Sequence, residues 1–569
     1  QQFMRLNLDH RELRWTTPLY NRFSETESKS FLWFDGAQYD AAINFLPYFY
    51  ERNRVYTETP VTARLENAVY EVLDPNSVAV IGTQALQIGD EPAITCYVTH
   101  EREELYSNVK IVPLRRNVST GNLERLVSFD LRISARPELQ RERPAQISFT
   151  NTSVLATGTW YRIGVVSNGV QKLDYSFLNS LGVDMSSLDP RNLRIYGNGR
   201  GQLSFNNYVE HADDLRESSI FVQGESDGIF DQSDYVLFYG VAPNTWEYDT
   251  LDANFHHHVH DYSDTTYYFI SPDLGPGARI QAQPSSALAV THTVNTFDDY
   301  GYHEFDNENL IKSGRSWYGE KFDIISSYSF AFNFPNIETS QQAWCEADLI
   351  SRFGGTHSYN VVCQSASATL SCSASQMNTY YAPYAAPASQ DISFLPNGPV
   401  LTVTVTRNAN ANGTPLGWLN WVEVNVRRQL RMSGSQMGFR DVNSVGAGNV
   451  AEYYFGNYTS NTVIWDVTDY WNPKTQMVTP NAGDLVWRLP SDSVREFHAF
   501  EGNQFFTPVN HGRVANQNLH ALQPVEYIIV AHPLFLAQAQ ELAQLHADYD
   551  TLTSVIVTPQ QIYNEFSSG

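Results

Sequence analysis

Three aspartates in the segment that begins at Gly224 have the spacing of a calcium-binding loop. Asp227 precedes a glycine, and Asp231 and Asp234 follow at the spacing of the later ligands. In such a loop the glycine permits a sharp turn, and the carboxylate oxygens converge on one cation. The first half of the pattern departs from this loop, because Gln223 stands where an aspartate is expected. The segment therefore predicts either a structural Ca²⁺ site or an Asp/Gly-rich turn that enters the next strand.

The histidines of the run HHHVH, residues 256–260, raise the question of a zinc site. In a strand, His256, His258 and His260 share one face, and imidazole is a good metal ligand. No cysteine or glutamate partner is placed nearby in the sequence, and the adjacent aspartates suit turns. We therefore interpret this run as a polar, solvated strand edge rather than as a metal centre.

The four cysteines lack the spacing of a zinc or redox motif. They are Cys96, Cys345, Cys363 and Cys372, and no pair of them forms a Cys-x-x-Cys unit. Cys363 and Cys372 flank an expected hairpin, so a cross-strand disulfide between them is one interpretation and two buried free thiols are the other. None of the four has a sequence context that suggests a nucleophile.

Composition excludes several classes of function. The chain has 62 acidic and 37 basic residues and a net charge of −25, with no basic stripe, which argues against nucleic-acid binding. No apolar run reaches the roughly 18 residues of a membrane-spanning helix. No local group of residues supplies a nucleophile, a base and an orienting partner together.

The elements that must position these residues are mainly strands. Apolar and polar residues alternate through most of the chain, which indicates antiparallel, half-buried strands, and turn residues recur between them. We expect a mainly β protein with several sandwich-like domains. The expected β-rich domains are 1–155, 156–310 and 311–505, followed by a linker and an α/β segment at 506–569. The charged, proline-bounded stretch 136–144 predicts a boundary or a long loop.

The start of the second domain predicts a short hairpin and a helix. Asn168-Gly169 lies between two strand-like runs, and this dipeptide favours a tight hairpin turn because both residues tolerate positive φ. The stretch 174–182 that follows predicts a short helix.

The last 45 residues follow a different pattern. The runs at 527–530 and 554–557 are continuously apolar, as in strands of a parallel sheet. Between them, Phe535, Ala539 and Leu542 form one apolar helix face. Thr558 begins a capping box for a second helix. This is the β-α-β-α start of an α/β domain, and two strands cannot bury both faces, so we expect the domain to continue beyond Gly569.

Six sequence blocks in order resemble the gingipain-type cysteine peptidases. They cover roughly 155–569, while the first 150 residues match only loosely; the blocks are WYRIGV…YGNG (160–199), DGIFDQSDYVLFYG (227–240), DYSDTTYYF (261–269), SGRSWYGEKF (313–322), GWLNWVEVNVRRQLRM (417–432) and ANQNLHALQ…EFSSG (515–569). The resemblance implies a β-rich region ahead of a caspase-like α/β peptidase domain. It places the catalytic His and Cys downstream of Gly569, so no residue of this chain is assigned a catalytic role. His532 and His546 match no catalytic position; we expect a loop residue and a helix-surface residue.

Within that family the blocks are most similar to surface sortases of the type IX secretion system. This implies an exported, outer-membrane-associated protein of a Bacteroidetes-like Gram-negative cell, with no required cofactor. The implied partners are an outer-membrane shuttle protein of the PorV type, cargo with type IX C-terminal signal domains, and a surface lipopolysaccharide acceptor. Two alternatives stay open: a secreted gingipain-like protease that only hydrolyses, and a non-catalytic cell-surface binding protein.

Overall fold

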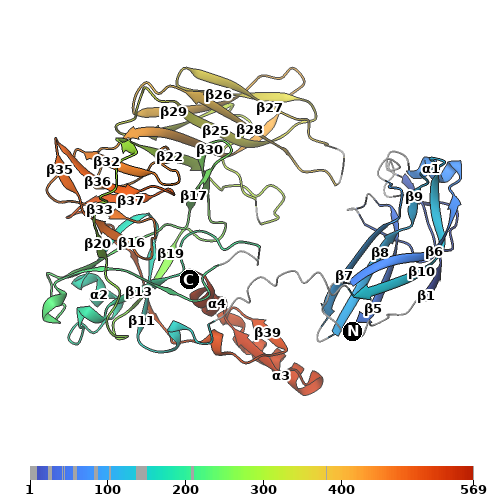
Figure 1. Cartoon of the computed structure of the whole chain (residues 1–569), viewed down its shortest axis with the longest axis horizontal. Coiled ribbons are helices and arrows are strands. Elements are labelled where there is room, and N and C mark those ends of the chain that lie inside the picture. Colours follow the sequence, from blue (N-terminus) through green and yellow to red (C-terminus); the bar gives the residue numbers. More distant parts are fainter. Residues whose placement is uncertain are drawn as a thin grey trace. The chain divides into compact units, whose positions relative to one another are not determined.

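The computed structural model has two compact units, Gln1–Ser148 and Phe149–Gly569 (Figure 1). It describes residues 9–22, 28–40, 43, 45–55, 61–81, 88–101, 104–135, 150–206, 211–314, 316–377, 379 and 381–567. The charged stretch 136–144, predicted as a boundary or long loop, lies outside the described residues.

The first unit is built from antiparallel strands around two apolar clusters. One sheet contains β1 (Asp9–Glu12), β10 (Leu123–Ala135), β6 (Val61–Val72) and β9 (Leu114–Arg116). A second contains β4 (Gln38–Tyr39), β5 (Pro47–Val55), β8 (Glu104–Val112) and β7 (Ala93–Glu101). A hairpin, β2 (Leu19–Arg22) with β3 (Ser28–Phe31), and the helix α1 (Pro75–Ile81) complete the unit. Phe34, Phe129 and Val109 are fully buried in the larger of these clusters.

The second unit opens with two small sheets that share a core. One has the order β14 (Arg216–Ser218), β13 (Arg194–Gly197), β19 (Thr266–Ser271), β11 (Trp160–Val165), β38 (Val509–Val514). The other has the order β12 (Gly169–Asp174), β16 (Tyr235–Gly240), β15 (Phe221–Gln223). The predicted helix is confirmed as α2 (Tyr175–Leu181), capped by Asp174 and ended by Gly182 at φ 90°.

The predicted hairpin around Asn168-Gly169 is wrong. Strands β11 and β12 form on either side of the dipeptide, but β11 pairs with β19 and β38, whereas β12 pairs with β16. The turn therefore passes the chain from one sheet to the other, and the Asn168 side chain accepts a hydrogen bond from the Ala242 N–H at 2.6 Å.

A ten-stranded sheet forms the centre of the second unit. Its order is β20 (Gln281–Gln283), β34 (Lys474–Gln476), β33 (Thr462–Asp466), β37 (Glu496–Glu501), β31 (Gln436–Arg440), β22 (Thr296–Glu304), β30 (Leu416–Gln429), β25 (Ala343–Arg352), β28 (Ala386–Phe394), with β23 (Lys321–Phe322) beside β30. Most of its ladders are antiparallel, and β20–β34 is parallel. Strand β30 is the longest of the sheet, and it pairs with β22 on one side and β25 on the other.

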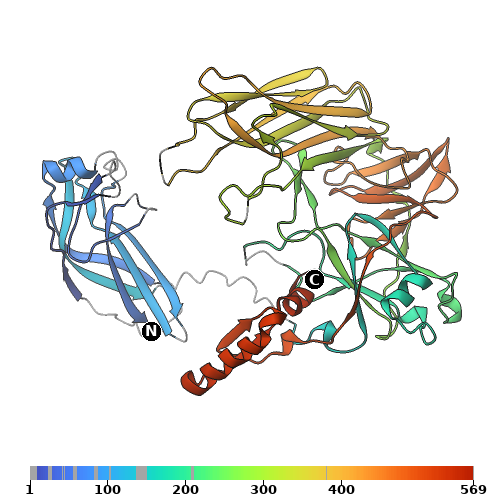
Figure 2. The ribbon, with the colours of Figure 1, turned by 180° about the vertical axis from the view of Figure 1, so that it is seen from behind.

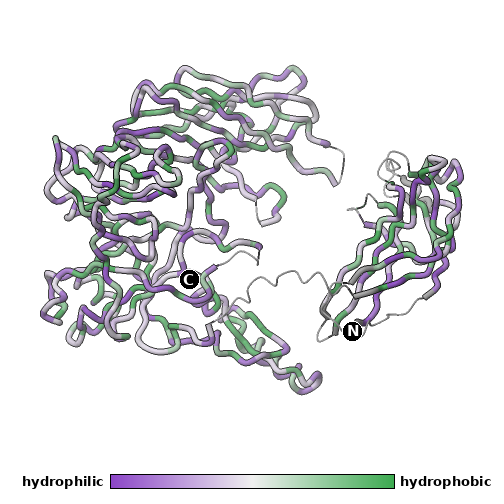
Figure 3. The backbone as a smooth tube through the Cα atoms, viewed as in Figure 1, coloured by the Kyte–Doolittle hydropathy of each residue, from purple (hydrophilic) through white to green (hydrophobic). Residues whose placement is uncertain are grey.

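Two four-stranded sheets pack against this large sheet, which is therefore shared by two β-sandwiches. One contains β24 (Ser327–Asn333), β29 (Val400–Arg407), β26 (His357–Cys363) and β27 (Ala366–Cys372), and it shares a core with β25 and β30. The other contains β21 (His292–Val294), β32 (Val450–Gly456), β36 (Asp484–Pro490) and β35 (Thr479–Asn481), and its core holds the stacked rings of Tyr453 and Trp487. Hydrophobic and hydrophilic residues alternate along these strands (Figure 3).

The domain bounds expected from the sequence stay a prediction, but strand pairing crosses two of them. Strand β38 lies in the segment expected to be a linker, yet it pairs with β11 of the second unit's first sheet. Strand β22 precedes residue 311, yet it pairs with β30 over nine residues.

The C-terminal β-α-β-α unit is confirmed. Its strands β39 (Tyr527–Val530) and β40 (Ser554–Val557) are parallel, and its helices are α3 (Leu536–Asp550), after the short turn η7 (Pro533–Phe535), and α4 (Pro559–Phe566). The predicted capping box holds, since Gln561 N donates to Thr558 Oγ1 and Thr558 N donates to Gln561 Oε1. Helix α3 covers one face of the strand pair (Figures 1 and 2). Of the predicted apolar helix face, Ala539 is buried, whereas Phe535 and Leu542 are exposed.

Candidate functional site

Helix α4 attaches the C-terminal unit to the β-rich part through a buried carboxylate. The residues of α4 that are most buried are Asn564 and Glu565, and Glu565 is fully buried. Its carboxylate accepts hydrogen bonds from the backbone N–H of Leu519, from the side chain of Gln517 at 2.9 Å and from Nδ1 of His520 at 2.6 Å. We call Glu565, Gln517, Leu519 and His520 the α4 anchor.

Further contacts extend the α4 anchor into the first sheets of the second unit. Nε2 of His520 lies 3.1 Å from the backbone oxygen of Asp213. Asn198, just after β13, donates to the backbone oxygen of Ser567. Burial opposes protonation of His520, but its hydrogen bonds to Glu565 and to the Asp213 backbone, with the charges of Asp214 and Glu565, together outweigh this, so the pKa of His520 is raised. The carboxylate of Glu565 is therefore saturated with donors, and its contact with His520 favours the protonated imidazole.

The three predicted calcium ligands lie in the loop between β15 and β16. Asp227 ends the short 3-10 turn η5 (Glu225–Asp227), and its carboxylate accepts from the N–H of Ile229 at 3.0 Å. Asp231 accepts from Ser233 N and Oγ, both at 2.7 Å. Asp234 is buried and accepts from Asp231 N at 2.9 Å. Each carboxylate is thus engaged by its own loop, and calcium binding there stays a prediction.

Among the described residues, a different group brings metal-ligand atoms together. One ligand atom each of His256, Glu346 and Glu423 lies within 4.8 Å of the others. His256 belongs to the hairpin of β17 (Thr245–Asp249) and β18 (Asn254–His258), and β18 contacts strand β30; β17 is labelled in Figure 1.

The side chain of Asn425 fixes the position of this hairpin. Its Oδ1 accepts from Phe255 N at 2.8 Å, and its Nδ2 donates to Phe255 O at 2.9 Å. Trp246 of β17 stacks on Tyr300 of β22 with 3.9 Å between ring centroids. The hairpin is therefore held by hydrogen bonds on one strand and by ring packing on the other.

Glu423 bridges two histidines of the hairpin. Its Oε2 lies 2.9 Å from Nδ1 of His256, and its Oε1 accepts from His257 N at 2.7 Å and contacts Nδ1 of His257. Nε2 of His257 lies 2.6 Å from Glu304, and Nε2 of His256 lies 2.9 Å from Asp252. We call His256, His257, Glu304, Glu346 and Glu423 the His–Glu cluster.

The interpretation of this run as a solvated strand edge is wrong for two of its histidines. The side chain of His257 is 3% exposed and that of His256 is half-buried, whereas His258 is exposed. Strand β18 ends at His258, so His260 does not share its face. The partners come from β22, β25 and β30, far away in the sequence, so no local spacing could reveal them.

Burial and neighbouring charges shift the pKa values of several residues of the His–Glu cluster and of Asp348 beside it. Desolvation, with help from Glu423 and Asp348, raises the pKa of Glu346. Desolvation also raises the pKa of Asp348 to about 6. For His256 and His257 burial works against protonation, but hydrogen bonds to carboxylates outweigh it and raise both pKa values.

Of the two interpretations of Cys363 and Cys372, the structure has the buried free thiols, and the two residues are not a cross-strand pair. All four thiols are free. In the hairpin of β26 and β27, Cys363 lies opposite Ala366, and Cys372 lies opposite His357 at the other end. Six residues of strand separate the two positions, roughly 20 Å. Cys363 instead contacts Cys345 across the sandwich core, and this contact together with burial raises the pKa of the Cys345 thiol.

The two histidines of the C-terminal unit have local roles. His532 caps η7, where its ring accepts from the N–H of Leu534. His546 lies on α3 and its Nδ1 contacts Asp550 at 2.6 Å.

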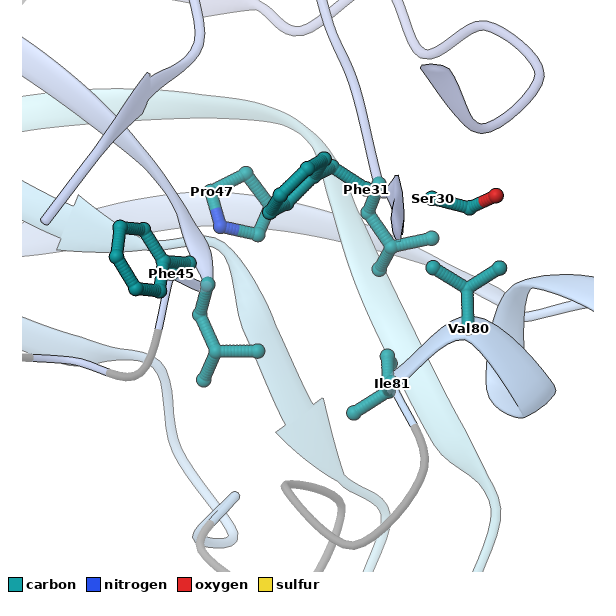
Figure 4. A pocket seen from close by; sticks show the side chains of 8 residues that line it. Ser30, Phe31, Phe45, Pro47, Val80 and Ile81 are labelled. Atoms are coloured by element: carbon teal, nitrogen blue, oxygen red, sulfur yellow. The ribbon is translucent and has the colours of Figure 1, made fainter. Parts of the chain in front are cut away.

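A small pocket in the first unit contains no group of reactive or charged side chains. It is lined almost wholly by apolar side chains, including Phe31, Phe45, Pro47 and Ile81 (Figure 4). Among the described residues, no helix is both long and apolar enough to cross a membrane.

The C-terminal unit resembles a known peptidase family. Residues 520–569, which contain part of the α4 anchor and the whole β-α-β-α unit, match Peptidase family C25. No curated protein matches the chain.

A solved structure gives the particular likeness. The chain is PorU-like in fold: it resembles dimeric latent PorU from Porphyromonas gingivalis with a TM-score of 0.64 and 23% identity over 74% of this chain. It spans only 39% of that PorU chain. The complex of pro- and mature domains of RgpB, also from Porphyromonas gingivalis, matches 24% of this chain and 86% of its own at 13% identity, with a TM-score of 0.17.

Proposed function

We propose that this chain is the N-terminal region of a cell-surface cysteine peptidase that acts as a sortase of the type IX secretion system. The observation that carries the proposal is the combination of two likenesses in one chain. The last 50 residues match a cysteine peptidase family, and 74% of the chain has the fold of PorU. The proposed reaction removes the C-terminal signal domain of secreted cargo and transfers the cargo to a surface lipopolysaccharide.

In the complete protein, a cysteine thiolate attacks the peptide bond before the signal domain and forms an acyl-enzyme. A histidine carries the proton to the leaving amine, and an amine of the lipopolysaccharide then resolves the thioester. We place both catalytic residues downstream of Gly569. The α4 anchor supports this arrangement, because it attaches the β-α-β-α unit to the β-rich part of the chain. The β-rich part would then receive a shuttle protein of the PorV type and the cargo.

The test is deletion of the complete gene in its source bacterium, followed by mass spectrometry of secreted cargo. We expect cargo to keep its C-terminal signal domain, and the complete gene to restore processing. A complementing gene with the catalytic cysteine changed to alanine should fail. A Cys96→Ser gene is the matched control, since Cys96 lies in the first unit and should leave processing intact.

The same experiment separates the alternatives. Cargo that ends in an amide-linked glycolipid supports transfer, whereas a free C-terminal carboxylate supports a protease that only hydrolyses. Full processing by the cysteine-to-alanine gene would show a non-catalytic binding protein and would overturn the proposal.

A further inference from the structure

Strand β30 places charged residues on a covered face of its sheet. Val422, Val424 and Val426 point into the sandwich core. The alternate positions, Glu423 among them, face the β17–β18 hairpin. A buried charge is costly unless it is paired, so this face needs a compensating cation.

The strand register makes the charges repel. Glu346 of β25 lies directly opposite Glu423 of β30, and like charges in that position destabilise a sheet. Asp348 follows on the same face of β25, with its carboxylate held by Asn420 at 2.9 Å. Four carboxylates, those of Glu423, Glu346, Glu304 and Asp252, lie around the imidazoles of His256 and His257.

Three of these side chains already place metal-ligand atoms close to one another. The closest set is His256, Glu346 and Glu423, with one ligand atom each within 4.8 Å of the others. They come from three strands, β18, β25 and β30. Imidazole nitrogen and carboxylate oxygen are both ligands of Zn²⁺, and three protein ligands leave the fourth position of a tetrahedral site open.

The surrounding residues orient these ligands. Asp252 lies 2.9 Å from Nε2 of His256, which leaves Nδ1 to face Glu423. On the other side, His257 holds Oε1 of Glu423 and is itself held by Glu304. A carboxylate behind a histidine ligand fixes its tautomer and raises its basicity.

We propose that His256, Glu346 and Glu423 bind a divalent transition-metal ion of the Zn²⁺ class, which fastens the β17–β18 hairpin to the ten-stranded sheet. The ion takes the place of the proton between His256 and Glu423 and neutralises the repulsion between Glu423 and Glu346. Ca²⁺ is disfavoured here because it prefers a shell of oxygen ligands. This site is independent of the proposed peptidase reaction.

The test is titration of the 569-residue chain, stripped of metal, with Zn²⁺ at neutral pH. We expect one tightly bound ion by elemental analysis and a rise in Tm of roughly 5 °C at saturating metal. Co²⁺ should give visible absorption bands of a low-symmetry nitrogen and oxygen site, and Zn²⁺ should displace it.

The decisive variant is Glu346→Gln, because its two effects have opposite signs. Removal of the like charge should leave the metal-free Tm unchanged or higher, so the variant folds, while the bound ion and the Zn²⁺-dependent rise are lost. His258→Gln is the control, since His258 lies on the same strand but is exposed. Equal zinc binding by Glu346→Gln and the unmodified chain, or no stoichiometric zinc in the unmodified chain, would overturn the proposal.

Discussion

The α4 anchor and the His–Glu cluster both bury a glutamate beside a histidine, but they surround it differently. Glu565 accepts from two backbone N–H groups, an amide side chain and His520. Glu423 meets His256 and His257 and also lies opposite a second carboxylate, Glu346. The first site is saturated with donors, whereas the second has an excess of negative charge. We therefore expect the α4 anchor to hold the C-terminal unit at all working pH values, and the stability of the His–Glu cluster to depend on pH and on bound cations.

The largest expected effect comes from Glu565→Gln. The amide cannot accept from all four donors and leaves His520 with only the more distant carboxylate of Asp213, at 3.5 Å, so we expect unfolding to become easier by about 3 kcal/mol. Hydrogen exchange of 559–567 should rise well above that of the rest of the chain. Glu541→Gln, at an exposed position of α3, is the control and should change neither measurement.

The same substitution at Glu423 should cost less, about 1–2 kcal/mol. Glu423→Gln loses acceptor capacity for two histidines, but it also removes the repulsion from Glu346. Denaturant unfolding followed by tryptophan fluorescence measures the cost, since Trp246 of this hairpin stacks on Tyr300 of β22. Glu247→Gln, exposed on that hairpin, is the control. Equal costs at Glu423 and Glu565 would break the distinction between the two sites.

The free energy of unfolding should depend more steeply on pH through the His–Glu cluster than through the α4 anchor. The folded pKa values of His256, His257 and His520 are raised, so their stabilisation is full below the unfolded pKa of about 6.5 and is lost as pH rises through the folded values. Asp348, with its pKa raised to about 6, favours the folded state when protonated and loses that contribution between about pH 4 and 6.

Melting curves from pH 4 to 8 measure this dependence. We expect Asp348→Asn to flatten the acidic part and His257→Gln to flatten the part above pH 6.5. His520→Gln should flatten only the upper part, and by less than His257→Gln if the cluster is the more responsive site. An unchanged slope in Asp348→Asn would contradict the raised pKa of this carboxyl.

The sequence patterns were sufficient for the parts of the fold that depend on local periodicity. Alternation predicted the strands, Asp174 and Gly182 delimit the predicted helix α2, and Thr558 caps α4 as expected. The Asn168-Gly169 hairpin failed because a dipeptide specifies a turn but not which sheet receives each strand.

The two buried networks were beyond local patterns for the same reason. Glu565 meets His520 across 45 residues, and His257 meets Glu423 across 166. Their partners are set by tertiary packing, which neither periodicity nor spacing records. The histidine run drew attention to the right strand, but it grouped His256 with His258 and His260, whereas the structure brings His256 and His257 to Glu423.

The smallest expected effect concerns the aspartate loop, which extends the comparison to a third acidic site. Asp227, Asp231 and Asp234 already accept hydrogen bonds from their own loop, so Ca²⁺ must compete with satisfied carboxylates. We therefore expect millimolar Ca²⁺ to raise the Tm by only about 1–2 °C. Asp231→Asn should remove this rise and leave the response to Zn²⁺ intact, because the two sites share no ligand. An unchanged Tm in millimolar Ca²⁺ would make the loop a plain turn and leave the His–Glu cluster as the cation-responsive site of the two.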